Sequence, residues 1–156
     1  MKNKLITLAA ACCGLVLLSS AASAQMQKCT EAGSIRSVTK ARSGNFETVT
    51  FEIVGSALPE IVEVRNEKPP ITNYGGDNLH MKGPYFKSVN LRMVPWTCEI
   101  RENLGARTTT ITGVKQEEQF EGYVGYAIGY TSKRKYVGVT KITGAKTSKV
   151  IVKFRR

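Results

Sequence analysis

Histidine and aspartate, which catalytic and metal sites commonly use, are almost missing from this sequence. Its 156 residues include one histidine, His80, and one aspartate, Asp77. A lone histidine without cysteines or clustered carboxylates beside it is typical of a surface position, and no serine lies in a G-x-S-x-G motif. We therefore expect no catalytic site, no bound metal and no cofactor.

One group of acidic residues keeps an enzymatic hypothesis open. Glu117, Glu118 and Glu121 lie close together in the sequence, and glycoside hydrolysis uses two carboxyl groups held across a cleft. Glutamates grouped at a loop are usually solvated, so we expect these three to be surface residues. An enzyme that uses His80 or this group is the third of three hypotheses for the function.

Helical periodicity is missing after residue 24, because no stretch repeats apolar residues at i, i+3, i+4 and i+7 over three turns. Short segments instead alternate apolar and polar residues, which predicts an all-β fold, an antiparallel β-sandwich of about eight short strands. Residues 67–77 are expected to form a loop. The expected strands are 35–42 as an edge strand or arm, 46–54, 61–65, one begun by Leu79 and Met81, 87–93, 108–115, 123–130, one around 136–139, and 150–155.

Two of these strands have informative faces, since successive side chains of a strand alternate between its sides. In the strand 87–93, the expected inward residues are Val89, Leu91 and Met93, and the expected outward ones are Ser88, Asn90 and Arg92. In the strand 123–130, the bulky face carries Val124, Tyr126, Ile128 and Tyr130, and the other carries Tyr123, Gly125, Ala127 and Gly129. The nearly smooth second face predicts a close approach by another part of the backbone.

A hydrophobic run long enough for a membrane anchor, about 20 residues, is also missing. Lys2 and Lys4 precede a shorter apolar run, Leu5 to Leu18, and Ala22-Ser23-Ala24 follows it. This pattern predicts a signal peptide over residues 1–24, cleaved before Gln25, and hence a periplasmic, secreted or wall-associated protein, peripheral at most to a membrane. A lipoprotein processed at Cys12 is the alternative.

Cysteine is sparse, with four residues in the whole chain. Removing residues 1–24 leaves only Cys29 and Cys98, too few for a zinc site and too far apart for a CxxC motif. In an exported chain such a pair predicts a disulfide, here one that ties an N-terminal arm, residues 25–45, to the domain. Two free thiols are the alternative.

The strand sequences resemble those of the AMIN-like domain family. The matching segments are Phe46-Glu47-x-Val49-x-Phe51-Glu52-Ile53, Gly76-Asp77-x-Leu79-x-Met81-x-Gly83 with Val89-x-Leu91, and Phe120-Glu121-Gly122-x-Val124-x-Tyr126-Ala127-Ile128-Gly129 with Tyr136-Val137-x-Val139 and Val150-Ile151-Val152. The resemblance spans 46–154 and implies a β-sandwich domain over residues 46–156. AMIN domains place exported proteins on the bacterial cell wall, so it also implies association with the wall.

Acidic residues are few beside the 23 Lys and Arg, and the 12 Asp and Glu leave a net charge of +11. Without Lys2 and Lys4 the charge is 21 minus 12, or +9. So basic a chain often binds nucleic acid, but export makes nucleic acid an unexpected partner. The sharper hypothesis is a polyanion site, and a solvated face is the plain alternative. The predicted polyanion site consists of a hairpin tip, Lys133, Arg134 and Lys135, and one face of the last strand, Lys149, Lys153 and Arg155.

Aromatic residues in loops offer a second set of contacts, because flat rings pack well against sugars. The candidates for glycan contact are Tyr74, Tyr85 and Trp96. Together these features predict an exported, non-catalytic domain that binds peptidoglycan or another anionic envelope polymer. The second hypothesis is a periplasmic or secreted module that binds an envelope protein along an exposed sheet edge.

Overall fold

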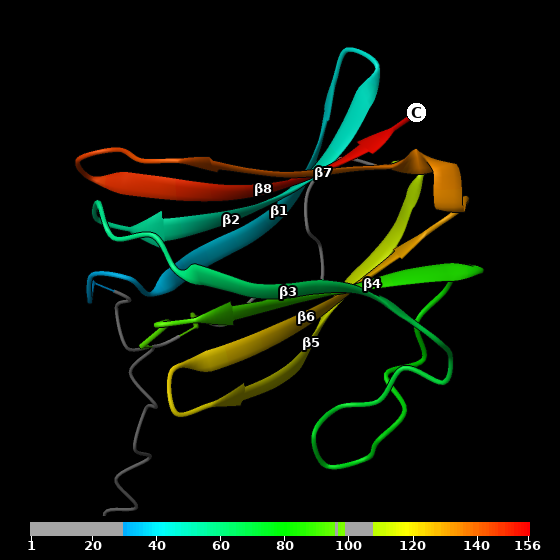
Figure 1. The fold of residues 1–156 in the computed structure, drawn as a ribbon, viewed down its shortest axis with the longest axis horizontal. Helices are drawn as coiled ribbons and strands as arrows, with labels where there is room; N and C mark the ends of the chain where they lie inside the picture. The colour runs from blue at the N-terminus through cyan, green and yellow to red at the C-terminus, as the bar shows by residue number, and fades with distance from the viewer. Residues whose placement is uncertain (1–29, 96, 99–107) are drawn as a thin grey trace, which may run out of the picture.

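The computed structural model describes residues 30–95, 97–98 and 108–156. Its strands form two four-stranded antiparallel sheets packed face to face, with the orders β1-β2-β8-β7 and β3-β4-β6-β5 (Figure 1). The predicted all-β antiparallel sandwich is confirmed, whereas residues 1–24 lie outside the described part. The strands are β1 (Ile35–Ser43), β2 (Phe46–Val54), β3 (Glu60–Glu67), β4 (Tyr85–Arg92), β5 (Ile111–Phe120), β6 (Tyr123–Tyr130), β7 (Tyr136–Ile142) and β8 (Thr147–Arg155).

The core lies between the sheets and follows the predicted alternation. Every second residue of β2, β6 and β8 faces it, and the Phe51 and Tyr126 rings join the sheets with centroids 4.9 Å apart. Full burial of one such aliphatic or aromatic side chain stabilises a fold by about 1.5–3 kcal/mol. These core residues are Val49, Phe51, Ile53, Val124, Tyr126, Ile128, Tyr130, Val150, Val152 and Phe154.

The smooth face of β6 is covered by the connection between β3 and β4, residues 68–84. Ile71 and Phe86 pack on Ala127 in a second, smaller hydrophobic cluster, against which Leu79 and Met81 also lie. A Cβ atom added at Gly129 would lie 2.6 Å from the Lys82 carbonyl oxygen. The predicted close backbone approach is therefore confirmed.

The predicted strand around Leu79 and Met81 is wrong. This segment is part of the 68–84 connection, and His80 there has a positive φ of 47°, which a strand does not allow. Leu79 and Met81 alternate because both pack down onto the outer face of the second sheet. Two apolar residues of a covering loop thus imitate the pattern of a strand.

Three further expectations are corrected along the second sheet. Met93, expected inward, is 69% exposed and has a φ of 63°, so β4 has already ended at Arg92. Ser88 and Asn90 lie on the outer face as expected, but both are buried. The strand expected at 108–115 runs instead from Ile111 to Phe120, with register shifts at Ile111/Gly113 and Gln116/Glu118.

Cys98 forms a disulfide, while Cys29 lies outside the described residues, so their pairing stays a prediction. The Cys98 N–H donates to the Ile35 carbonyl oxygen at 2.9 Å. Ile35 is six residues from Cys29 in sequence, a span of at most about 20 Å. Cys98 is thus within reach of the predicted arm, residues 25–45.

A peptide map checks this pairing. Trypsin would release residues 29–36 and 93–101, and we expect mass spectrometry of the unreduced protein to find these two peptides joined. Reduction should separate them. Detection of Cys98 joined to Cys12 or Cys13 instead would contradict the predicted arm.

No helix in the described ranges is long and apolar enough to cross a membrane.

Candidate functional site

The predicted basic tip is one turn of 3-10 helix, η1 (Lys133–Lys135), between β6 and β7. Ser132 precedes it in an extended conformation, and the Lys135 N–H donates to the Ser132 carbonyl oxygen at 2.9 Å. This spacing of three residues closes a tight turn. Lys133 and Arg134 are exposed and Lys135 is half-buried, so three cationic side chains leave the sandwich within one turn.

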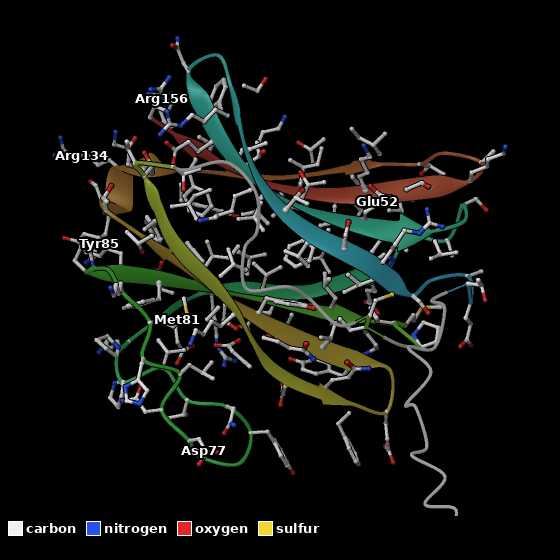
Figure 2. All side chains as sticks on the ribbon, turned by 180° about the vertical axis from the view of Figure 1, so that it is seen from behind. Glu52, Asp77, Met81, Tyr85, Arg134 and Arg156 are labelled. Atoms are coloured by element: carbon white, nitrogen blue, oxygen red, sulfur yellow. The ribbon has the colours of Figure 1, made fainter. Side chains whose placement is uncertain are left out.

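The end of β8 lies beside this turn. Its last residue, Arg155, is exposed, and η1 contacts β8. The Arg156 N–H donates to the Asn45 carbonyl oxygen at 2.9 Å in the turn between β1 and β2. Figure 2 shows Arg134 and Arg156 at the same end of the molecule. Lys133–Lys135, Arg155 and Arg156 therefore form one surface, called the basic end below.

Packed aromatic rings support the basic end. The ring centroid of Tyr130 lies 5.9 Å from that of Tyr85 and 5.1 Å from that of Phe154, and the Phe154 and Tyr136 centroids are 5.8 Å apart. Such pairs contribute about 0.5–1.5 kcal/mol each beyond the area that they bury. Because Tyr130 ends β6 and Tyr136 begins β7, these contacts fix both ends of the connection that carries η1.

Lys87 adds a cation that the sequence analysis missed. It pairs with Ile128, a core residue, so its side chain faces inward, and its Nζ lies 4.4 Å from the Tyr136 ring centroid. Burial lowers the pKa of Lys87. Lys133 Nζ lies 5.7 Å from the Tyr85 ring centroid, a second cation–π contact. Extending the alternation of Val89 and Leu91 back by two residues would have placed Lys87 inward.

The predicted cations of β8 do not all join the basic end. Lys149, Lys153 and Arg155 alternate with buried Val150, Val152 and Phe154, so they lie on the outer face of the first sheet. Six residues separate Lys149 from Arg155, which is about 20 Å along a strand. Lys149 also pairs in register with Glu52, at the opposite end of the sandwich. Only Arg155 belongs to the basic end, while Lys153 lies two residues back along the strand.

Carboxylates near the basic end are already engaged. Among the described residues, Glu47 is the second residue of β2 and pairs with Phe154, and Glu67 ends β3 and pairs with Phe86. Glu47 is fully buried and accepts hydrogen bonds from Thr109, Thr110 and Ile111. Glu67 accepts a hydrogen bond from Arg65 Nε at 2.9 Å. Both carboxylates are therefore held by contacts within the fold rather than by the exposed cations of the basic end.

The three aromatic candidates for glycan contact are not gathered on one surface. Tyr85 is half-buried at the basic end, where Figure 2 labels it. Tyr74 is 83% exposed in the 68–84 connection, whose tip, marked by Asp77, lies away from Tyr85 in that view. Trp96 lies outside the described residues. Of the two candidates that the structure describes, only Tyr85 lies where it can act together with the basic end.

The residues considered for catalysis lie apart from the basic end. His80 is exposed, and its N–H donates to Asn78 Oδ1 at 2.7 Å. Glu117 and Glu118, expected to be solvated at a loop, belong instead to β5, and both are half-buried. Glu117 Oε2 accepts a hydrogen bond from Ser88 Oγ at 2.6 Å. The expectation that this glutamate is simply solvated is wrong, because the outer face of the second sheet is partly covered.

No family model, no curated protein and no solved structure matches this chain, so the AMIN-like resemblance stays a prediction.

Proposed function

We propose that this chain is an exported, non-catalytic β-sandwich domain that binds an anionic polymer of the cell envelope through its basic end, with peptidoglycan as the foremost candidate. One observation carries the proposal. The β6–β7 turn and the chain's last two residues, distant in sequence, place Lys133–Lys135, Arg155 and Arg156 on one surface. The AMIN-like resemblance and the predicted signal peptide favour the same compartment.

The chemistry of these side chains suits a polymer with carboxylates or phosphates. Arginine offers a planar fork of donors that holds either group bidentately, and lysine supplies a compact positive charge. An isolated exposed ion pair contributes only about 0.2–1 kcal/mol. Five cations on one surface can contact a repeating polyanion together, so the weak contacts add up along the polymer.

Co-sedimentation of the purified protein with purified peptidoglycan tests this proposal. We expect the protein to pellet with the polymer at about 0.1 M salt, where the screening length is about 10 Å, and to lose most of this binding at about 1 M, where it is about 3 Å. Chitin, an uncharged polysaccharide, is the control and should retain little protein. Pelleting that is equal at both salt concentrations would show that charge does not drive the association.

The exposed edge of the first sheet favours the second function, binding of an envelope protein. β7 is the end strand of that sheet, and its Val137 and Ile142 are each 48% exposed. The unpaired backbone groups of such an edge can pair with an added strand. A stoichiometric protein partner in a pull-down, together with no retention on peptidoglycan, would favour this function over the first.

A further inference from the structure

A polar hollow lies on the outer face of the second sheet, away from the basic end. It has a volume of ≈ 350 Å³ and lies between the tip of the 68–84 connection and β5. Leu79 and Gly75 contribute to its wall, and the rest of its lining is polar or aromatic. The side chains that can recognise a ligand are Asn73, Tyr74, Gln116, Glu117, Glu118 and Gln119.

Hydrogen bonds give the tip beside the hollow a fixed shape. Asn73 Oδ1 accepts from the Asp77 N–H at 2.8 Å, Asn73 Nδ2 donates to Asp77 Oδ2 at 3.1 Å, and the Gly76 N–H donates to the Asn73 carbonyl oxygen at 3.0 Å. The Tyr74 N–H donates to the Glu117 carbonyl oxygen at 3.1 Å, which ties the tip to β5. The backbone of Tyr74 is thus anchored while its side chain is 83% exposed.

The register shift between Gln116 and Glu118 positions the carboxylate of Glu117. Its Oε2 accepts from Ser88 Oγ, and Ser88 is itself fully buried. Burial raises the pKa of Glu117, and the charges of Glu67 and Glu118 raise it further, although the Ser88 hydrogen bond and Arg65 act in the opposite direction. The Glu117 carboxylate is therefore partly desolvated and lies near other negatively charged side chains.

The carboxylates of the hollow form no ion pair with a described arginine or lysine, and the charge of Arg65 acts on Glu117 only at longer range. Five other glutamates lie within 4.0 Å of an arginine side-chain nitrogen, but neither Glu117 nor Glu118 does so in the described part. Lys115, the only basic residue of β5, pairs with neither. In a chain of net charge +11, this local excess of negative charge is the reverse of the overall balance.

We propose that this hollow binds a primary ammonium group carried on a small polar ligand, such as an amino sugar or a lysine side chain. The two carboxylates favour a cation, the amide oxygens accept its N–H groups, and the exposed Tyr74 ring offers a cation–π face. An anion would be repelled by Glu117 and Glu118. A purely apolar ligand would remove water from the two carboxylates without offering them an opposite charge.

Paired probes test the charge of the ligand. Glucosamine trisaccharide carries three ammonium groups, whereas its N-acetylated counterpart has the same backbone and none. We expect isothermal titration to show binding of the first and at least tenfold weaker binding of the second. A trilysine peptide with blocked termini is the second arm. Binding of both amines would show that the ammonium group suffices, and binding of the sugar alone would show that the amine must be carried on a sugar.

Single substitutions locate the site. We expect Tyr74→Ala to weaken glucosamine binding roughly threefold to thirtyfold, the range that an exposed to partly desolvated cation–π contact gives. Glu118→Gln should weaken it similarly, while Glu60→Gln, an exposed glutamate on β3, serves as the matched control and should leave it unchanged. Thermal unfolding verifies that all variants fold. Equal affinity for the two sugars, no binding of any amine, or native affinity in both site variants would overturn the proposal.

Discussion

Replacing Glu47 by alanine is expected to lower the free energy of unfolding by about 3–5 kcal/mol, the usual cost of breaking a buried charged network. The Glu47 side chain is fully buried and accepts hydrogen bonds from the Thr109 N–H (2.8 Å), Thr109 Oγ1 (3.0 Å), the Thr110 N–H (2.7 Å) and the Ile111 N–H (2.9 Å). It thereby joins β2 of the first sheet to the start of β5 in the second. Alanine would leave the buried N–H groups of Thr110 and Ile111 unpaired.

Two other glutamate variants make the measurement specific. Glu47→Gln keeps the shape but turns an amide N–H₂ toward N–H donors, and should cost about 1–3 kcal/mol. Glu52→Ala removes a glutamate of the same strand that lies 3.7 Å from Arg36 at the surface, and should cost at most about 1 kcal/mol. Urea unfolding measures all three. A loss for Glu47→Ala no greater than that for Glu52→Ala would refute the assigned role.

The same carboxylate gives the fold a defined pH dependence. Burial alone would raise the pKa of Glu47, but the hydrogen bonds from Thr109, Ile111 and Thr110 outweigh it and hold the pKa below its ordinary value of 4.5. A carboxyl group with a lower pKa in the folded state stabilises the fold fully above its unfolded pKa and loses that contribution as the pH falls through the folded value. Urea midpoints of the native protein should therefore fall below about pH 4 more steeply than those of Glu47→Gln.

Replacing Gly129 by alanine is expected to lower the free energy of unfolding by about 1–3 kcal/mol, as overpacking usually does. The added Cβ would lie 2.6 Å from the Lys82 carbonyl oxygen and 2.6 Å from Thr112 Oγ1. Those two atoms are themselves hydrogen-bonded across the glycine. The 68–84 connection would have to lift away from β6, and its hydrophobic cluster with Ala127 would loosen.

Gly113 provides the matched control, since it pairs directly with Gly129 on the neighbouring strand. A Cβ at Gly113 would meet only the Met81 methyl carbon, at 3.8 Å, an ordinary contact. Gly113→Ala should therefore change the stability by no more than about 0.5 kcal/mol. Equal losses of unfolding free energy for the two substitutions in urea would mean that the loss of a glycine, and not crowding by the added Cβ atom, lowers the stability.

The sandwich was predictable because each strand has one face toward a single core, so apolar and polar residues alternate along its sequence with a period of two. Val124, Tyr126 and Ile128 all face this core, and their spacing in the sequence shows it directly. Leu79 and Met81 do not, since they serve a second cluster that a connection builds on the outer face. The burial of Ser88 and Glu117 has the same cause. Local sequence does not reveal which loop folds back over which sheet.

The candidate site was predictable only in part, for a different reason. Residues Lys133–Lys135 are neighbours in sequence and stay neighbours on one turn. Lys149 and Arg155 share a face of β8, but the rise of the strand separates them by about 20 Å. Arg156 joins the basic end through its hydrogen bond to Asn45. Such placement depends on the pairing of β1, β2 and β8, which the sequence pattern does not specify.

The central claim is that the basic end, and not the overall positive charge, binds an anionic envelope polymer. Peptidoglycan co-sedimentation of two triple variants separates these causes, because each removes three positive charges. Lys133/Arg134/Lys135→Ala alters the basic end, while Lys141/Lys146/Lys149→Ala alters exposed lysines at the opposite end of the sandwich. Thermal unfolding verifies that both variants fold.

At about 0.1 M salt we expect the first variant to lose roughly tenfold of the affinity, since three surface contacts of about 0.2–1 kcal/mol each contribute about 0.6–3 kcal/mol together. The second should stay within about threefold of the native protein, because distant charges act only through screened long-range attraction. Equal losses in the two variants, or native binding by the first, would contradict the account.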